Sequence, residues 1–130
     1  MYQSPGFAGA ASRRYAAVHA GSRVESATPH GLIKILFEEL LLAMDACAAA
    51  LEHGDRTRAN DKHLRALSIV HALDSSLDFE RGGDIAVSLA VVYRETRKLM
   101  LAAHQDGNSA HVRRAHAIVA EIATAWNQIG

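Results

Sequence analysis

The chain has 130 residues with 14 basic and 14 acidic side chains, so its net charge is zero when its histidines are neutral. This balance disfavours nucleic acid as a partner, because a protein that neutralises phosphates needs a basic excess. The hydrophobic fraction is 49% but only 5% of residues are aromatic, and this alanine-rich composition favours one domain of closely packed helices.

Residues 1–23 show little hydrophobic periodicity and contain several glycines and serines, which is typical of a mobile N-terminal arm. We therefore expect a mobile arm over 1–23, flexible or loosely docked, and a four-helix bundle domain over 24–130. The arm lacks the apolar core of a signal peptide, and no apolar run is long enough to span a bilayer. These features predict a cytosolic protein without membrane insertion.

The first helix is expected to begin at Thr28 and Pro29, because threonine is a good N-cap and proline suits the first helical position. Its apolar residues continue to Gly54 and cover more than half of its circumference, so we expect a central helix. The single cysteine, Cys47, is predicted to be a small buried residue within it. The side chains expected to face solvent on this helix are Glu38, Glu39 and Asp45.

Two further helices are expected on either side of a double-glycine turn. The second runs from Thr57 or Asn60 to Asp78, with Leu64 facing inward, and the third runs from Asp84 to His104. Apolar residues on both recur at helical spacing and predict a shared buried stripe. The stripe residues are Ile69, Leu73, Leu77, Ile85, Leu89 and Val92, with Tyr93 at the margin.

A fourth helix is expected from Asn108 or Ser109 to Gln128, since both of the first two residues can cap a helix. Four helices joined by short connections predict an all-α fold, an antiparallel up-down four-helix bundle.

Motifs for chemistry are weak. The sequence contains eight histidines, but none are spaced three or four apart on one helix, so we expect no metal site and no cofactor. The segment HALDS at 71–75 is similar to the histidine-containing segment of phosphotransfer bundles, although Asp74 stands where a lysine would attract phosphate. A phosphotransfer domain reacting at His71 is therefore the alternative to a non-enzymatic protein, and a structural bundle that only dimerises is a third possibility.

Several segments between Tyr15 and Ile129, taken in their order along the chain, resemble the FliS family of flagellar secretion chaperones. The matching segments are VESATP at 24–29, LIKILF at 32–37, GGDIA at 82–86 and AW at 125–126, with the spacing of Ala66, Ile69, Leu73 and Leu77 between them. The chain departs from the family pattern at Glu38-Glu39, Ser88, Glu95, Thr96 and His104, which leaves the preferred flagellin open.

The resemblance implies a non-enzymatic cytosolic chaperone. Such a protein binds the disordered C-terminal segment of flagellin, prevents premature polymerisation and presents flagellin to the flagellar type III export apparatus. The resemblance implies flagellin as the partner, with the export-gate protein and a weak homodimer as further candidates. The implied activity requires no nucleotide or metal.

The helices carry more apolar residues than the core of one narrow bundle can bury, and the surplus residues are the candidates for flagellin binding. Single aliphatic side chains on the surface are also common in proteins without such a role. The candidates are Tyr15, Leu42, Val87, Val91, Tyr93 and Leu101. Phe7 and Tyr15 are also candidates for an N-terminal plug that occupies the binding surface when flagellin is absent, as the resemblance implies.

Overall fold

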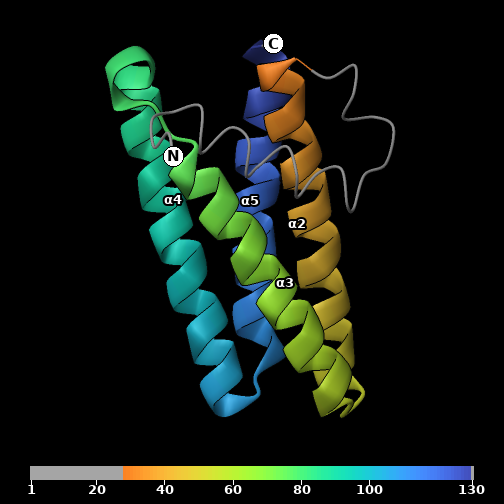
Figure 1. Ribbon diagram of the computed structural model, residues 1–130. Helices are drawn as coiled ribbons and strands as arrows, with labels where there is room; N and C mark the ends of the chain where they lie inside the picture. Colours follow the sequence, from red (N-terminus) through yellow and green to blue (C-terminus); the bar gives the residue numbers. More distant parts are fainter. Residues whose placement is uncertain (1–27, 130) are drawn as a thin grey trace, which may run out of the picture.

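The computed structural model describes residues 28–129, which form four antiparallel helices in one up-down bundle (Figure 1). This arrangement confirms the predicted fold class. The expectations for Phe7, Tyr15 and the arm over 1–23 lie outside the described residues. The helices are α2 (Pro29–Glu52), α3 (Arg56–Ser75), α4 (Phe79–Asp106) and α5 (Ser109–Ile129).

Helix α2 begins as predicted. Thr28 is its N-cap, and the Thr28 Oγ1 atom accepts a hydrogen bond from the Gly31 amide at 3.0 Å. The helix packs against α3 and α5 and contributes more buried residues to the core than any other described helix, which makes it central. Cys47 is buried as expected, and its thiol donates to the carbonyl of Ala59 at 3.5 Å.

The prediction that Glu39 faces solvent is wrong. Its side chain lies under α3, where a carboxylate oxygen accepts from Arg65 Nη2 at 2.6 Å, and the residue is 8% exposed. A partly buried carboxylate is tolerated here because it is paired with a guanidinium group. Glu38 is half-buried, whereas Asp45 is exposed as predicted.

Helix α3 starts slightly earlier than predicted, because the Asp55 carboxylate caps it by accepting from the Arg58 amide at 3.0 Å. It also ends earlier, at Ser75 rather than Asp78. The inward prediction for Leu64 is wrong, since this side chain is 67% exposed. Leu64 precedes the fully buried Ala66 by two positions, which places the two on nearly opposite sides of the helix.

Helix α4 begins one turn before the position predicted at Asp84. Asp78 caps this extra turn by accepting from the Arg81 amide at 3.1 Å. The backbone then bends at Gly83, whose φ of 50° suits glycine. The double glycine therefore lies inside the helical run as a kink, not ahead of it as a turn.

Most of the predicted hairpin stripe is in the core. Ile69, Leu73 and Leu89 are buried, while Leu77 and Val92 pack against the core from its edge. Ile85 is the exception to the prediction and is 54% exposed. Its position beyond the Gly83 kink, near the end of the bundle, leaves its side chain without a complete set of neighbours.

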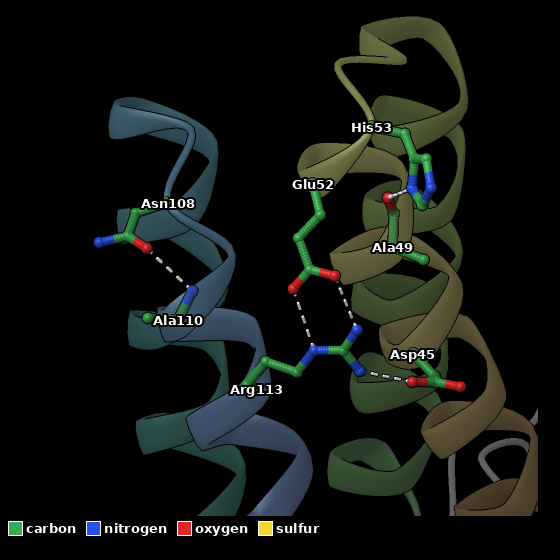
Figure 2. A network of polar contacts seen from close by, with 7 residues as sticks. All are labelled: Asp45, Ala49, Glu52, His53, Asn108, Ala110 and Arg113. Carbon is green, nitrogen blue, oxygen red and sulfur yellow. Dashed lines mark hydrogen bonds and ion pairs between the residues drawn. The ribbon is translucent and has the colours of Figure 1, made fainter.

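Helix α5 is capped by Asn108, whose side-chain oxygen accepts from the Ala110 amide at 2.9 Å. Figure 2 shows Arg113 reaching from α5 to two carboxylates on α2. Its Nη1 donates to Asp45 at 2.6 Å, and its Nε and Nη2 donate to the two oxygens of Glu52 at 3.3 and 3.1 Å. This bidentate contact sets the pairing of α2 with α5 at that end.

Candidate partner-binding site

An apolar groove opens at the end of the bundle where α3 and α5 end and α2 and α4 begin, the upper end in Figure 1. We call it the end groove. It has an outer compartment of about 320 Å³ between α4 and α5 and an inner compartment of about 260 Å³ that reaches α2 and α3. Three residues line both compartments: Ile85, Leu89 and Trp126.

The outer compartment has aliphatic walls. Ile85 and Leu89 of α4 face Ile122 and Ile129 of α5 across it. Ser88 and Asp84 are the polar residues that line it. Such a lining can bind aliphatic side chains but offers few hydrogen bonds, so it favours apolar segments over small polar ligands.

The inner compartment lies over the bundle core. Leu73 and Leu77 of α3, Ile33 of α2 and Tyr93 of α4 contribute to its lining. Tyr93 is only 1% exposed, and burial is the main cause that raises the pKa of its phenol, with the nearby Asp74 charge as a further cause. The phenol therefore remains neutral at physiological pH.

Large apolar side chains remain exposed around the end groove. Ile85, Phe79 and Ile129 are each more than half exposed although they lie within two helices that meet at this end. Clusters of exposed apolar residues beside an apolar concavity are a feature of surfaces that bind a partner. The cap at Asp78 and the kink at Gly83 lie in the first turns of α4, and these turns extend past the end of α3 (Figure 1).

The indole of Trp126 is fixed at three places. Its Nε1–H donates to the carbonyl oxygen of His30 at 3.0 Å. The imidazole of His30 stacks on the indole with ring centroids 4.3 Å apart and an angle of 7° between the planes. Phe37 meets it edge-on at 6.3 Å. These contacts join the first turn of α2 to the last turns of α5 across the end of the bundle.

Two of the residues that line the inner compartment are charged, and both lie at its rim. Asp78 and Arg81 form a long ion pair of 3.8 Å between Oδ2 and Nε, and the arginine is almost fully exposed. An ion pair of this kind contributes little to stability because water screens it. The Arg81 guanidinium can therefore reorient toward a bound partner, while the Asp78 carboxylate stays in place as the cap of α4.

Most of the predicted binding residues lie outside the end groove. Leu42 lies on α2, and Val87, Val91 and Leu101 lie on α4, all at least half exposed. These four are absent from the lining of both compartments, whereas Tyr93 is in the floor of the inner one. Tyr15 lies outside the described residues.

The residues that the sequence argument missed are Ile85, Trp126 and Ile129. Ile85 has the helical spacing of a core residue, which predicts a buried position for it, and Trp126 enters the sequence analysis only as part of the segment at 125–126. One signal was available: the stripe on α4 continues up to a double glycine, where a helix can extend past its neighbours and leave its first apolar residue uncovered.

The opposite end of the bundle holds a pair of histidines. The rings of His63 and His104 stack with centroids 4.9 Å apart, beside Cys47. Burial lowers the pKa of His63, and the charge of His104 lowers it further. Within residues 28–129, the structure contains no group of three or more His, Cys, Asp or Glu side chains that could hold a metal ion.

His71, the residue singled out for the phosphotransfer alternative, is exposed on α3. The neighbouring Asp74 carboxylate accepts from Arg97 of α4 at 3.3 Å. The described helices include none that is long and apolar enough to cross a membrane.

The comparisons with known proteins that cover most of the chain point to one family. The sequence model of the family described as flagellar protein FliS matches residues 11–130. The chain is 32% identical to the flagellar secretion chaperone FliS of Salmonella typhimurium over 99% of this chain and 93% of that protein. It is 28% identical to FliS of Vibrio cholerae over 88% and 85%, and 26% identical to FliSB of Pseudomonas aeruginosa over 92% and 94%. From the extent of these matches, the chain belongs to the FliS family of flagellar secretion chaperones.

Proposed function

We propose that this export chaperone binds the disordered C-terminal segment of flagellin in the end groove. In the cytosol it thereby prevents premature polymerisation and presents flagellin to the flagellar type III export apparatus. The observation that carries this proposal is the end groove itself, an apolar concavity bordered by the exposed side chains of Ile85, Phe79 and Ile129.

The chemistry of the groove suits an amphipathic helix. A helix that places one apolar face in a hydrophobic groove is a common mode of peptide recognition. A flexible segment that folds on binding loses conformational entropy, and this cost keeps the complex releasable. The action is binding alone, so the proposal requires no catalytic step and no cofactor.

The end groove alone is too small to account for a stable complex. Burying one aliphatic side chain contributes about 1.5–3 kcal/mol, whereas association itself costs about 4–15 kcal/mol. A few side chains in two compartments therefore yield a weak complex. We infer that the flagellin segment extends onto the exposed aliphatics outside the groove: Leu42, Val87, Val91 and Leu101.

The start of α2 supports a role for the N-terminal residues. His30, in the first turn of α2, contacts the groove residue Trp126, so the chain enters the bundle beside the groove. Phe7 and Tyr15 are the candidates to occupy the groove when flagellin is absent. The export-gate protein and a second copy of the chain remain further candidate partners.

A binding experiment with two forms of flagellin tests the proposal. Isothermal titration calorimetry with full-length monomeric flagellin should show a saturable complex, and a flagellin lacking its C-terminal segment should show none. Equal binding of the two forms would contradict the proposal. Labelling of His71 by a phosphodonor, abolished in His71→Gln, would instead favour the phosphotransfer alternative.

A further inference from the structure

Trp126 is the aromatic residue among the three that line both compartments of the end groove. It is half-buried and lies three residues before the end of α5, where the helix has fewer neighbours than in the middle of the bundle. A large ring in such a place has several rotamers open to it unless neighbouring groups hold it. The groove has its two-compartment form only while the indole keeps its position.

We propose that His30 is a positioning residue for flagellin binding, because its imidazole holds the Trp126 indole where it lines both compartments. This inference rests on the proposed function, since it concerns how the same groove receives the flagellin segment. His30 belongs to the first turn of α2 and touches the partner-binding surface through Trp126.

The geometry separates two contributions of His30. Its backbone carbonyl accepts the indole N–H at 3.0 Å, and its ring covers the indole at 4.3 Å in a nearly parallel stack. Substitution of the side chain removes the stack but leaves the carbonyl acceptor. The effect of the ring can therefore be measured without removing a buried hydrogen bond.

Holding the indole in advance lowers the cost of binding. Each flexible side chain that becomes ordered in an interface opposes association, and a ring that is already fixed avoids this loss. A fixed indole also sets the distance between the two apolar side chains of a bound helix that can enter the two compartments. Because it lines both compartments together with Ile85 and Leu89, the bound helix presents aliphatic side chains from successive turns, one to each compartment.

The test uses the fact that Trp126 is the chain's single tryptophan, so its fluorescence reports on this ring alone. The full chain is compared with His30→Ala, His30→Phe and the control His71→Ala, which removes an exposed histidine from α3. The binding probe is a peptide with the sequence of flagellin's C-terminal segment, in which any tryptophan is replaced by phenylalanine.

In the free protein, time-resolved anisotropy should show faster local motion of the indole in His30→Ala than in the unmodified chain. An aromatic pair contributes enough to predict a loss of peptide affinity of about 2- to 12-fold in the same variant. His30→Phe should restore both the slow motion and the affinity, because phenylalanine can stack in place of the imidazole. His71→Ala should change neither.

The outcomes distinguish this inference from the proposed function. An unmodified chain that fails to bind the peptide contradicts the proposed function, while the anisotropy still decides whether His30 positions the indole. If the unmodified chain and His30→Ala bind the peptide equally with equal indole motion, the positioning role is wrong and the proposed function stands. Equal loss in His30→Ala and His30→Phe would also overturn the stacking role.

Discussion

The two ends of the bundle differ in what closes them. At one end, Arg113 joins α5 to α2 through hydrogen bonds to Glu52 and Asp45, and Asn108 caps the start of α5 (Figure 2). At the other end, α4 extends past the kink at Gly83, and apolar side chains remain exposed around a groove. At the polar end, the charged group of Arg113 pairs with those of Glu52 and Asp45. At the apolar end, large apolar side chains remain exposed to solvent. Stability and binding are therefore assigned to different ends of one small fold.

The largest expected effect comes from placing a charge in the end groove. Ile85→Asp should weaken flagellin binding by about 100-fold or more, because a carboxylate would replace an apolar wall of the groove and lose its hydration under the bound segment. The thermal midpoint should change little, since Ile85 is exposed in the free protein. Isothermal titration calorimetry measures the affinity, and calorimetric scanning measures the midpoint.

The matched control is Leu64→Asp, which changes an equally large exposed aliphatic on the outer side of α3. It should leave flagellin affinity unchanged. If Leu64→Asp weakens binding as strongly as Ile85→Asp, the contrast between the groove and the remaining exposed aliphatics is wrong.

A smaller effect is expected on the outer side of α4. Val87→Asp and Val91→Asp should each reduce flagellin affinity by about 3- to 10-fold, because each removes one exposed aliphatic contact rather than a groove wall. Val87 and Val91 are one helical turn apart, so both should contact the same stretch of flagellin. Unchanged affinity in the double variant, measured by calorimetry, would contradict the extension of the binding surface onto Val87 and Val91.

The polar end should respond to acid through His63. Burial and the neighbouring His104 lower the pKa of His63 in the folded protein, with Arg56 and the Cys47 thiol lining the same small pocket. The unfolded chain, with an ordinary histidine pKa near 6.5, then binds more protons than the folded one at acid pH. Stability is therefore unaffected above about pH 7.5 and decreases as the pH falls through about 6.5.

Thermal midpoints between pH 7.5 and 5.5 measure this effect, which should amount to a few degrees, about 2–5 °C. His63→Gln removes the titrating group and should flatten the profile. The same slope in both proteins would show that other groups cause the pH dependence.

The smallest effect is expected from Arg113→Ala, which should lower the thermal midpoint by about 2 °C or less. The arginine and its two carboxylates are all more than one third exposed, so water screens their attraction. Flagellin affinity should remain that of the unmodified chain because the network is at the other end. A loss of affinity would mean that the two ends are coupled.

The starts of α2 and α5 could be predicted because their signals are local, whereas α4 begins five residues before the predicted Asp84. Thr28 and Pro29 mark the start of α2, and Asn108 marks the start of α5, each through a cap formed within three residues. The central stripe was also predictable, since helical periodicity identifies the side that turns toward partners. These features gave the fold class and the order of the helices.

The double glycine indicates that the start of α4 can be uncovered, but the groove itself depends on where the neighbouring helices end, which the sequence does not show. Ile85 has the spacing of a core residue, yet the kink at Gly83 and the early end of α3 leave it uncovered. Glu39 looked solvent-facing because the sequence does not show that Arg65 lies above it. Periodicity identifies the apolar side of a helix, but the length and tilt of its neighbours decide how much of that side is buried.

Site-specific photo-crosslinking tests the central claim most directly. A photoreactive amino acid is introduced at Ile129, an exposed residue of the outer compartment, and in a second protein at Leu64. With monomeric flagellin, we expect a crosslink from position 129 to flagellin's C-terminal segment and none from position 64. A crosslink from position 64 to that segment, with none from position 129 in a complex of normal affinity, would contradict it.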